Sequence, residues 1–316
     1  MVVRVNDVVA LPWRAARVCD ARQEHAAIAP LVVVLPGCGR FVTAPFTRVA
    51  VGRFPNGELR VEVPQRIPGR CVVVGSISPP AGNLERLTLV VHTLRRAGAR
   101  WVTALLPYLA YARQDRALRG EGLGLGWVGE LLGASGIDEV VCVDVHGAKA
   151  SEILGLPLSS LSPAGLLAGA LPEAWRHDVT FVAPDEGAIG RCSALARAAG
   201  VDRPIVYARK RRVSSGVEHL GLVGSPGRRV VVVDDILDTG ATLVSCCQAL
   251  RMSGVRQLGV IATHGLFTGD RWRAVFSEGV QEMWVTDTVL SRRRPPQAHV
   301  VPVAPLLVPV LEGAIA

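Results

Sequence analysis

Residues 234–242 carry the densest group of side chains that could do chemistry, Asp-Asp-Ile-Leu-Asp-Thr-Gly-Ala-Thr. They follow the apolar run 230–233 and precede a predicted helix. A helix start leaves backbone N–H groups free, and the helix dipole adds partial positive charge there. Thr239 and Thr242 add hydroxyl donors, and Gly240 lets the backbone approach a ligand closely. The segment therefore predicts a phosphate-binding loop.

Three acidic side chains of the same segment suit a sugar or a metal ion. Asp234 and Asp235 come at the carboxyl end of the predicted strand, where open α/β sheets bind ligands, and Asp238 follows. Carboxylate oxygens there could bind sugar hydroxyls or a hydrated Mg²⁺. The alternative is a surface turn with capping residues, but a cap needs fewer polar side chains than this loop carries.

Other polar side chains also follow predicted strands. Arg113 and Gln114 can form hydrogen bonds with phosphate or ribose oxygens. His146 comes just after an apolar run. The basic residues 210–212 could stabilise the charge of a transferred phosphoryl group. Each of these features also has a non-functional explanation. Arg113 could form an ion pair with Asp115, His146 could be a structural histidine, and residues 210–212 could be a solvated basic surface.

Short apolar runs alternate with helix-like stretches along the chain. Continuous apolar runs are typical of strands buried on both faces of a parallel sheet. They cover residues 72–74, 102–106, 140–143, 181–183, 230–233 and 258–262. Helices are predicted over residues 84–97, with Asn83 as N-cap and Gly98 as the stop, and over residues 241–253, before Gly254. The order predicts a doubly wound α/β fold.

An internal repeat divides the chain. Gly69-Arg70 precedes one apolar run and Gly227-Arg228 precedes another, and residues 96–100 are echoed by residues 251–256. Both copies read strand, loop, helix, glycine, strand, but only the second has the phosphate-binding loop. We therefore predict domains over residues 1–160 and 161–316, with the last ~15 residues packing back on the first domain.

These motifs together resemble the ribose-phosphate diphosphokinase (phosphoribosyl pyrophosphate synthetase) family, of which the chain looks like an atypical member. The matching segments, in the order expected of that family, are Phe54-Pro55-Asn56-Gly57-Glu58, residues 107–116, Asp144-Val145-His146, residues 183–187, residues 210–212, residues 234–242 and residues 262–267. The resemblance covers roughly residues 45 to 310. It implies two tandem phosphoribosyltransferase-type doubly wound parallel-sheet domains.

The resemblance also implies a role for each site residue. Lys210 and Arg212 would be catalytic, in a flexible loop. ATP would be bound by Phe54, Asn56, Glu58, Arg113 and Gln114, and ribose 5-phosphate by Asp234, Asp235, Asp238, Thr239, Gly240 and Thr242. His146 and Asp185 would hold Mg²⁺. The family's nucleobase hairpin, here residues 54–58, reaches into a neighbouring subunit, so the resemblance implies a homo-oligomer built from dimers, up to a hexamer.

Three features depart from the family pattern. The family usually has Asp where this chain has Asn56, and an amide can donate as well as accept, so we expect altered nucleotide selectivity. Residues 1–45 match poorly, and the segment 120–126 is unusually rich in glycine.

Composition excludes several other classes. The chain has 316 residues, 49% hydrophobic and 20% charged, which argues against disorder. No apolar stretch reaches the ~18 residues of a membrane helix, and no signal peptide is evident. The net charge of +8 comes from scattered arginines, which suit small polyanions better than nucleic acid. Seven cysteines without a C-x-x-C pair favour buried thiols, so we expect a cytoplasmic protein with neither nucleic acid nor membrane as partner.

We therefore expect transfer of the diphosphoryl group of ATP to the 1-hydroxyl of ribose 5-phosphate, giving 5-phosphoribosyl 1-diphosphate and AMP. Positioning and charge stabilisation would carry the reaction, since no residue is an obvious general base. Two alternatives are a phosphoribosyltransferase that consumes phosphoribosyl diphosphate and a catalytically inactive regulatory homologue. The ATP motifs argue against the first, and the basic segment and the phosphate-binding loop argue against the second.

Overall fold

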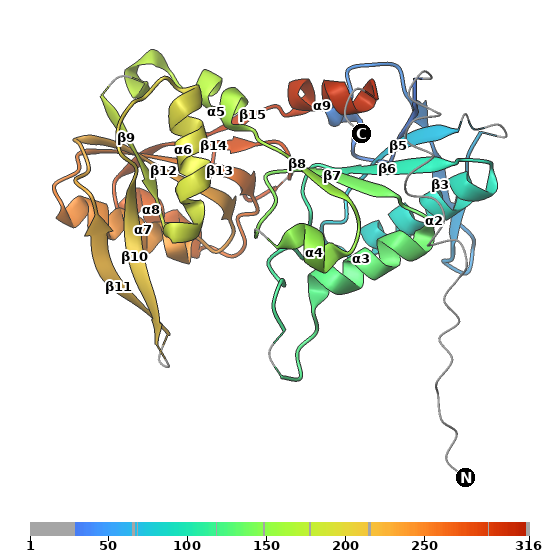
Figure 1. The fold of residues 1–316 in the computed structure, drawn as a ribbon, viewed down its shortest axis with the longest axis horizontal. Coiled ribbons are helices and arrows are strands. Elements are labelled where there is room, and N and C mark those ends of the chain that lie inside the picture. The colour runs from blue at the N-terminus through green and yellow to red at the C-terminus, as the bar shows by residue number, and fades with distance from the viewer. Residues whose placement is uncertain are drawn as a thin grey trace, which may run out of the picture.

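The computed structural model describes residues 29–313, apart from residues 65, 66, 68, 118, 148, 177, 214, 215 and 290, and describes only the backbone of residues 210–213 and 216–220. Two α/β halves lie side by side, each built on its own sheet (Figure 1). This arrangement confirms the predicted fold class.

The first sheet is parallel throughout, in the order β2-β1-β5-β6-β7-β8. Its strands are β1 (Leu31–Val34), β2 (Thr47–Arg48), β5 (Arg70–Val74), β6 (Trp101–Leu106), β7 (Glu139–Val143) and β8 (Leu158–Leu161). The helices of this half are η1 (Gly39–Phe41), α2 (Gly82–Arg96), α3 (Gly124–Ser135) and α4 (Ala150–Leu154), and a separate hairpin pairs β3 (Ala50–Arg53) with β4 (Leu59–Glu62). Every residue of β5, β6 and β7 is buried, as the continuous apolar runs predict.

The second sheet has the order β11-β10-β9-β12-β13-β14-β15 and is parallel except for the β10–β11 pair at its edge. Its strands are β9 (Val179–Ala183), β10 (Val206–Val213), β11 (Gly216–Val223), β12 (Arg229–Leu237), β13 (Gln257–Gly265), β14 (Val280–Thr286) and β15 (Ala298–Val301). The helices are α5 (Ala164–Ala170), η2 (Glu173–Trp175), η3 (Glu186–Ala188), α6 (Ile189–Ala198), α7 (Ala241–Met252), η4 (Arg271–Arg273) and α8 (Ala274–Ser277).

Alternate residues of each strand serve the two faces of its sheet. In the first half, Val33 and Val73 pack with α2 and α3, whereas Val34 and Val74 pack with the last helix, α9 (Ala304–Leu311), through Leu307. The chain therefore returns from the second half and covers the first (Figure 1). Burial of apolar side chains on both faces is the main source of stability for such a sheet.

The internal repeat is visible in the backbone. Gly69 O, just before β5, accepts hydrogen bonds from Arg100 N (2.7 Å), just before β6, and from Trp101 N (2.9 Å), the first residue of β6. Arg228 O, just before β12, accepts the same pair of bonds from the start of β13, each 3.1 Å long. The two strand–helix–strand units are thus built alike.

Some local predictions are wrong. Asn83 is not the N-cap of α2, which begins at Gly82; its amide instead donates to Ser78 O (2.8 Å) and braces the preceding loop. The strand predicted over residues 230–233 continues to Leu237, because pairing with β13 outweighs the low strand propensity of the two aspartates. Six described cysteines are buried, as predicted, while Cys19 lies outside the described residues.

Candidate active site

The loop after β12 forms one wall of a cavity of about 220 Å³ between the two halves. Gly240 stands directly before α7 with φ +79°, a conformation that glycine adopts without strain. A Cβ at this position would lie 2.5 Å from Trp272 Cα, so no larger residue fits there. The cavity is lined by Arg113, His146, Asp185, Asp234, Asp235, Ile236, Asp238, Thr239, Gly240, Ala241, Thr242 and Leu243.

The cavity lies where the connections of the second sheet change direction. From β9 the chain moves outward to β10, and from β12 it moves the other way to β13. Asp185 follows β9, and Asp234 and Asp235 lie among the last four residues of β12. Ligands of doubly wound sheets bind at such a switch point, outside the carboxyl ends of the strands.

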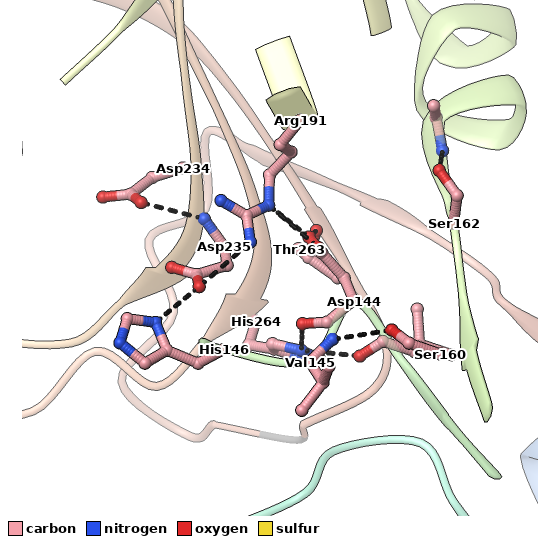
Figure 2. Close-up of polar contacts among 12 residues, drawn as sticks. Asp144, Val145, His146, Ser160, Ser162, Arg191, Asp234, Asp235, Thr263 and His264 are labelled. Atoms are coloured by element: carbon pink, nitrogen blue, oxygen red, sulfur yellow. Dashed lines mark hydrogen bonds and ion pairs between the residues drawn. The ribbon is translucent and has the colours of Figure 1, made fainter. Parts of the chain in front are cut away.

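A charged network joins the two halves, and two of its members, His146 and Asp235, line this cavity (Figure 2). Arg191, on α6, donates Nε to both carboxylate oxygens of Asp144 (2.9 and 2.8 Å) and Nη2 to Asp235 Oδ2 (3.1 Å). His146 Nδ1 donates to the same Asp235 oxygen (2.7 Å), and Thr263 donates its hydroxyl to Asp144. One guanidinium thus connects a carboxylate that follows β7 with a carboxylate of β12.

This network gives the two adjacent aspartates, Asp234 and Asp235, different pKa values. Burial raises the pKa of Asp234 well above its ordinary range, and the neighbouring charge of Asp235 raises it further. Burial alone would also raise the pKa of Asp235, but the hydrogen bond from His146 and the charge of Arg191 hold it well below its ordinary range. The same hydrogen bond raises the pKa of His146. Asp235 is therefore the ionised member of the pair.

A second contact between the halves runs through His264, which is 2% exposed. Its Nε2 donates to the carbonyl oxygen of Val143 (3.1 Å), so Nδ1 accepts from the Thr288 hydroxyl (2.8 Å). Tyr108 packs against the imidazole at 4.7 Å between ring centroids. The ends of β13 and β7 are therefore joined directly.

The structure brings most of the predicted site residues together but not all. Arg113 Nη1 reaches across to Asp238 Oδ2 (2.5 Å), which ties the first half to the phosphate-binding loop. Gln114 is exposed beside it and its side chain rests on Gly124, at the start of α3. Lys210 and Arg212 lie on β10, paired with β11, and not in the expected loop; their side chains lie outside the described residues.

The predicted nucleobase residues lie on the β3–β4 hairpin, at the end of the first half away from the second half (Figure 1). Phe54 is 46% exposed there. Asn56 Oδ1 accepts from the backbone N–H of Glu58 (3.2 Å), which fixes the turn. None of these three residues lines the cavity.

Arg191 is the functional residue that sequence reasoning missed. Arg191 lies in the first turn of α6, six positions after Asp185. The signal that could have found it is a basic residue one helical turn after the motif of residues 183–187, which follows a predicted strand. Asp144, Thr263 and His264 belong to motifs found in the sequence, but nothing there indicated that they meet.

The described residues include no group of three or more His, Cys, Asp or Glu side chains arranged to hold a metal ion. Mg²⁺ is usually bound by one or two carboxylates, with water and substrate phosphates completing the shell. Asp185 offers such a carboxylate to the cavity, and Asp234 would offer a second one when a bound cation displaces its proton. His146 has its second nitrogen oriented by Asp235, as metal-binding histidines do. The residues present therefore fit Mg²⁺ bound together with substrate.

Comparison with known proteins agrees with this architecture. The model of the N-terminal domain of ribose phosphate pyrophosphokinase matches residues 38–136, and the phosphoribosyl transferase domain model matches residues 149–274. The phosphoribosylpyrophosphate synthetase structure from Mycobacterium smegmatis superposes with a TM-score of 0.77 at 26% identity, over 90% of this chain and 98% of that one. The fold is thus that of proteins with two tandem phosphoribosyltransferase-type domains.

Curated relatives narrow the class further. The ribose-phosphate pyrophosphokinase of Ralstonia nicotianae is 32% identical over 256 residues, 79% of this chain and 80% of the relative. That of Maricaulis maris is 33% identical over 279 residues, 84% and 88% of the two chains. The chain belongs to the ribose-phosphate pyrophosphokinase family and is an enzyme of the diphosphotransferase class. In the part of the chain that the structure describes, no helix has the length and apolar character needed to cross a membrane.

Proposed function

We propose that this chain transfers the diphosphoryl group of ATP to the 1-hydroxyl of ribose 5-phosphate. The hydroxyl oxygen bonds to the β-phosphorus, the bond from that phosphorus to the oxygen bridging to the α-phosphate breaks, and the hydroxyl proton is lost. The products are 5-phosphoribosyl 1-diphosphate and AMP. The observation that carries the proposal is the cavity at the β9–β12 switch point, where a phosphate-binding loop faces carboxylates and Arg113.

Each wall of the cavity has a task in this reaction. The loop residues Thr239 to Thr242 bind the 5-phosphate, and Asp235, held ionised and oriented by Arg191 and His146, accepts from the ribose hydroxyls. Arg113 contacts the triphosphate of ATP once it leaves Asp238. Mg²⁺, held by Asp185 and Asp234 with His146 adjacent, would neutralise charge on the phosphate oxygens.

The first experiment measures AMP release from ATP, ribose 5-phosphate and Mg²⁺. Thr239→Ala should weaken ribose 5-phosphate binding in calorimetry while ATP binding is kept, because the hydroxyl lies in the phosphate-binding loop. Thr88→Ala is the control, since that hydroxyl bonds only within α2 (Leu84 O, 3.1 Å). Equal loss of both ligands, or no AMP release by the native enzyme, would contradict the proposal; pyrophosphate release from phosphoribosyl diphosphate and a base would favour a phosphoribosyltransferase.

The basic residues of β10 supply the remaining positive charge in this proposal. Lys210→Ala and Arg212→Ala should lower kcat by roughly 10²–10³ with little change in KM, since the charge they meet develops in the transition state. Arg209→Ala, on the same strand and exposed, is the matched control. A kcat unchanged in both variants would mean that the segment is a solvated surface.

The position of the β3–β4 hairpin supports a homo-oligomer. The hairpin lies at the end of the first half away from the second half, and Phe54 does not line the cavity of its own chain, so in this proposal it contacts ATP in another subunit. Inactive Phe54→Ala and Thr239→Ala chains, mixed and refolded together, should then recover activity, because some sites receive both native segments. No recovery would place the hairpin outside the ATP site. The buried thiols of Cys38, Cys71, Cys142, Cys192 and Cys247 support a reducing, cytoplasmic location.

A further inference from the structure

The first half has a cavity of its own, of about 240 Å³, which the proposed reaction does not use. It is enclosed by the loops that follow β1 and β5 and by the start of α2, together with Thr288 from the second half. From β1 the chain moves outward to β2, and from β5 it moves the other way to β6. The cavity therefore occupies the switch point of the first sheet, the place where ligands of doubly wound sheets bind.

The internal repeat makes this cavity the counterpart of the active-site cavity. The loop 75–81 joins β5 to α2 just as residues 238–240 join β12 to α7. The two cavities are of similar volume, about 240 and 220 Å³. Their chemistry is opposite, because the active-site cavity is lined by four aspartates, whereas none of the described residues lining the first-half cavity is acidic.

The walls of the first-half cavity carry two half-buried guanidinium groups. Arg40 donates Nε to Asp287 O (3.1 Å) and Nη1 to Gly37 O (2.6 Å), and Arg86 donates Nη1 to Asn83 Oδ1 (3.1 Å). A guanidinium has five N–H groups, so each arginine keeps donors beyond these bonds among the described residues. The Asp287 carboxylate, whose Oδ1 accepts from Val303 N (2.8 Å), interacts electrostatically with Arg40 but does not line the cavity.

Hydroxyl groups complete the set of donors. Ser76 and Ser78 line the cavity, and the Ser76 oxygen accepts from Ser78 N (3.2 Å), which leaves its O–H to donate. The Asn83 amide fixes this loop by donating to Ser78 O (2.8 Å). Donors thus come from three separate segments, which suits a tetrahedral oxyanion better than a planar carboxylate.

We propose that this cavity is a second anion site, which binds the phosphate group of a small ligand through Arg40, Arg86 and the Ser76–Ser78 loop. The ligand is inorganic phosphate or the phosphate end of a molecule no larger than a pentose phosphate, since the volume matches that of the active-site cavity. With no acidic side chain in its lining, the site binds the anion without a metal ion. The size limit rests on the proposed function, whereas the anion site itself does not depend on that reaction.

Calorimetric titration tests the site in a Thr239→Ala, Thr242→Ala background, which suppresses binding in the active-site cavity. Inorganic phosphate should bind, and Arg86→Gln should weaken this binding about ten- to hundredfold, the loss expected for one charge-assisted hydrogen-bonding group. Arg96→Gln, an exposed arginine on the same helix, is the matched control and should leave binding unchanged. If Arg86→Gln and Arg96→Gln titrate alike, the site does not exist.

Two further arms keep the test decisive. Ser76→Asp places a carboxylate in the cavity without touching Arg86, and it should also abolish phosphate binding; if a folded variant binds as before, the proposal is wrong. Ribose 5-phosphate is titrated in parallel. Tighter Arg86-dependent binding than inorganic phosphate would identify a sugar phosphate as the ligand, and weaker binding would identify free phosphate.

Discussion

Arg191→Met removes the cation that holds the two halves together, and it should destabilise the protein strongly. The Arg191 side chain is 20% exposed, and it neutralises Asp144 and Asp235, whose side chains are 13% and 8% exposed. Removing one partner of such a buried ion pair leaves an uncompensated charge and costs about 3–5 kcal/mol. Because 1 kcal/mol shifts Tm by about 2–4 °C for a unit of 150–250 residues, Tm should fall by roughly 6–20 °C.

Differential scanning calorimetry measures this shift, with Arg197→Met as the control on the exposed face of the same helix. Asp144→Asn combined with Arg191→Met should recover part of the loss, because the double variant no longer buries the unpaired Asp144 charge. KM for ribose 5-phosphate should also rise, since Asp235 loses the group that orients it. A Tm within about 2 °C of the native protein, which corresponds to less than 1 kcal/mol, would refute the assignment of Arg191 as the junction between the halves.

Three further predictions test other parts of the structure. Gly129→Ala should prevent native packing of α3, because the added Cβ would lie 1.8 Å from the Leu154 carbonyl oxygen. Gly165→Ala is the control: it has open space around it and should leave stability unchanged or raise it by up to about 1 kcal/mol. Thermal melting compares the two variants. Burial lowers the pKa of His264, so acidification below about pH 6.5 protonates this residue only in the unfolded chain and lowers the free energy of unfolding. His264→Gln should lack that part of the pH dependence in urea unfolding at pH 5.5 and 7.5, and an unchanged dependence would contradict the burial argument. Asn56→Asp should raise the ratio of kcat/KM for ATP to that for GTP, since a carboxylate accepts from an amino group but cannot donate to a 6-oxo group; a constant ratio would mean that position 56 does not read the base.

Local sequence determined much of the architecture. The buried strands were legible because a parallel sheet covered on both faces requires continuous apolar runs, as in β5, β6 and β7. The phosphate-binding loop could be predicted because a strand end, three acids, two threonines and a glycine stand together within nine residues. These side chains are therefore neighbours in the chain before any tertiary structure forms. Contiguity along the chain is the physical reason in both cases.

Tertiary structure alone decided what lies across from that loop. Arg191 and Asp144 are 47 residues apart in sequence and His264 and Val143 are 121 apart, and no local pattern links such pairs. Packing of the two sheets with their carboxyl ends facing each other brings these residues into contact, which separates the pKa values of Asp234 and Asp235. Tertiary structure likewise placed Lys210 and Arg212 in a hairpin, where β10 pairs with β11. The basic residues do not themselves specify this partner strand, so their own sequence could not predict the pairing.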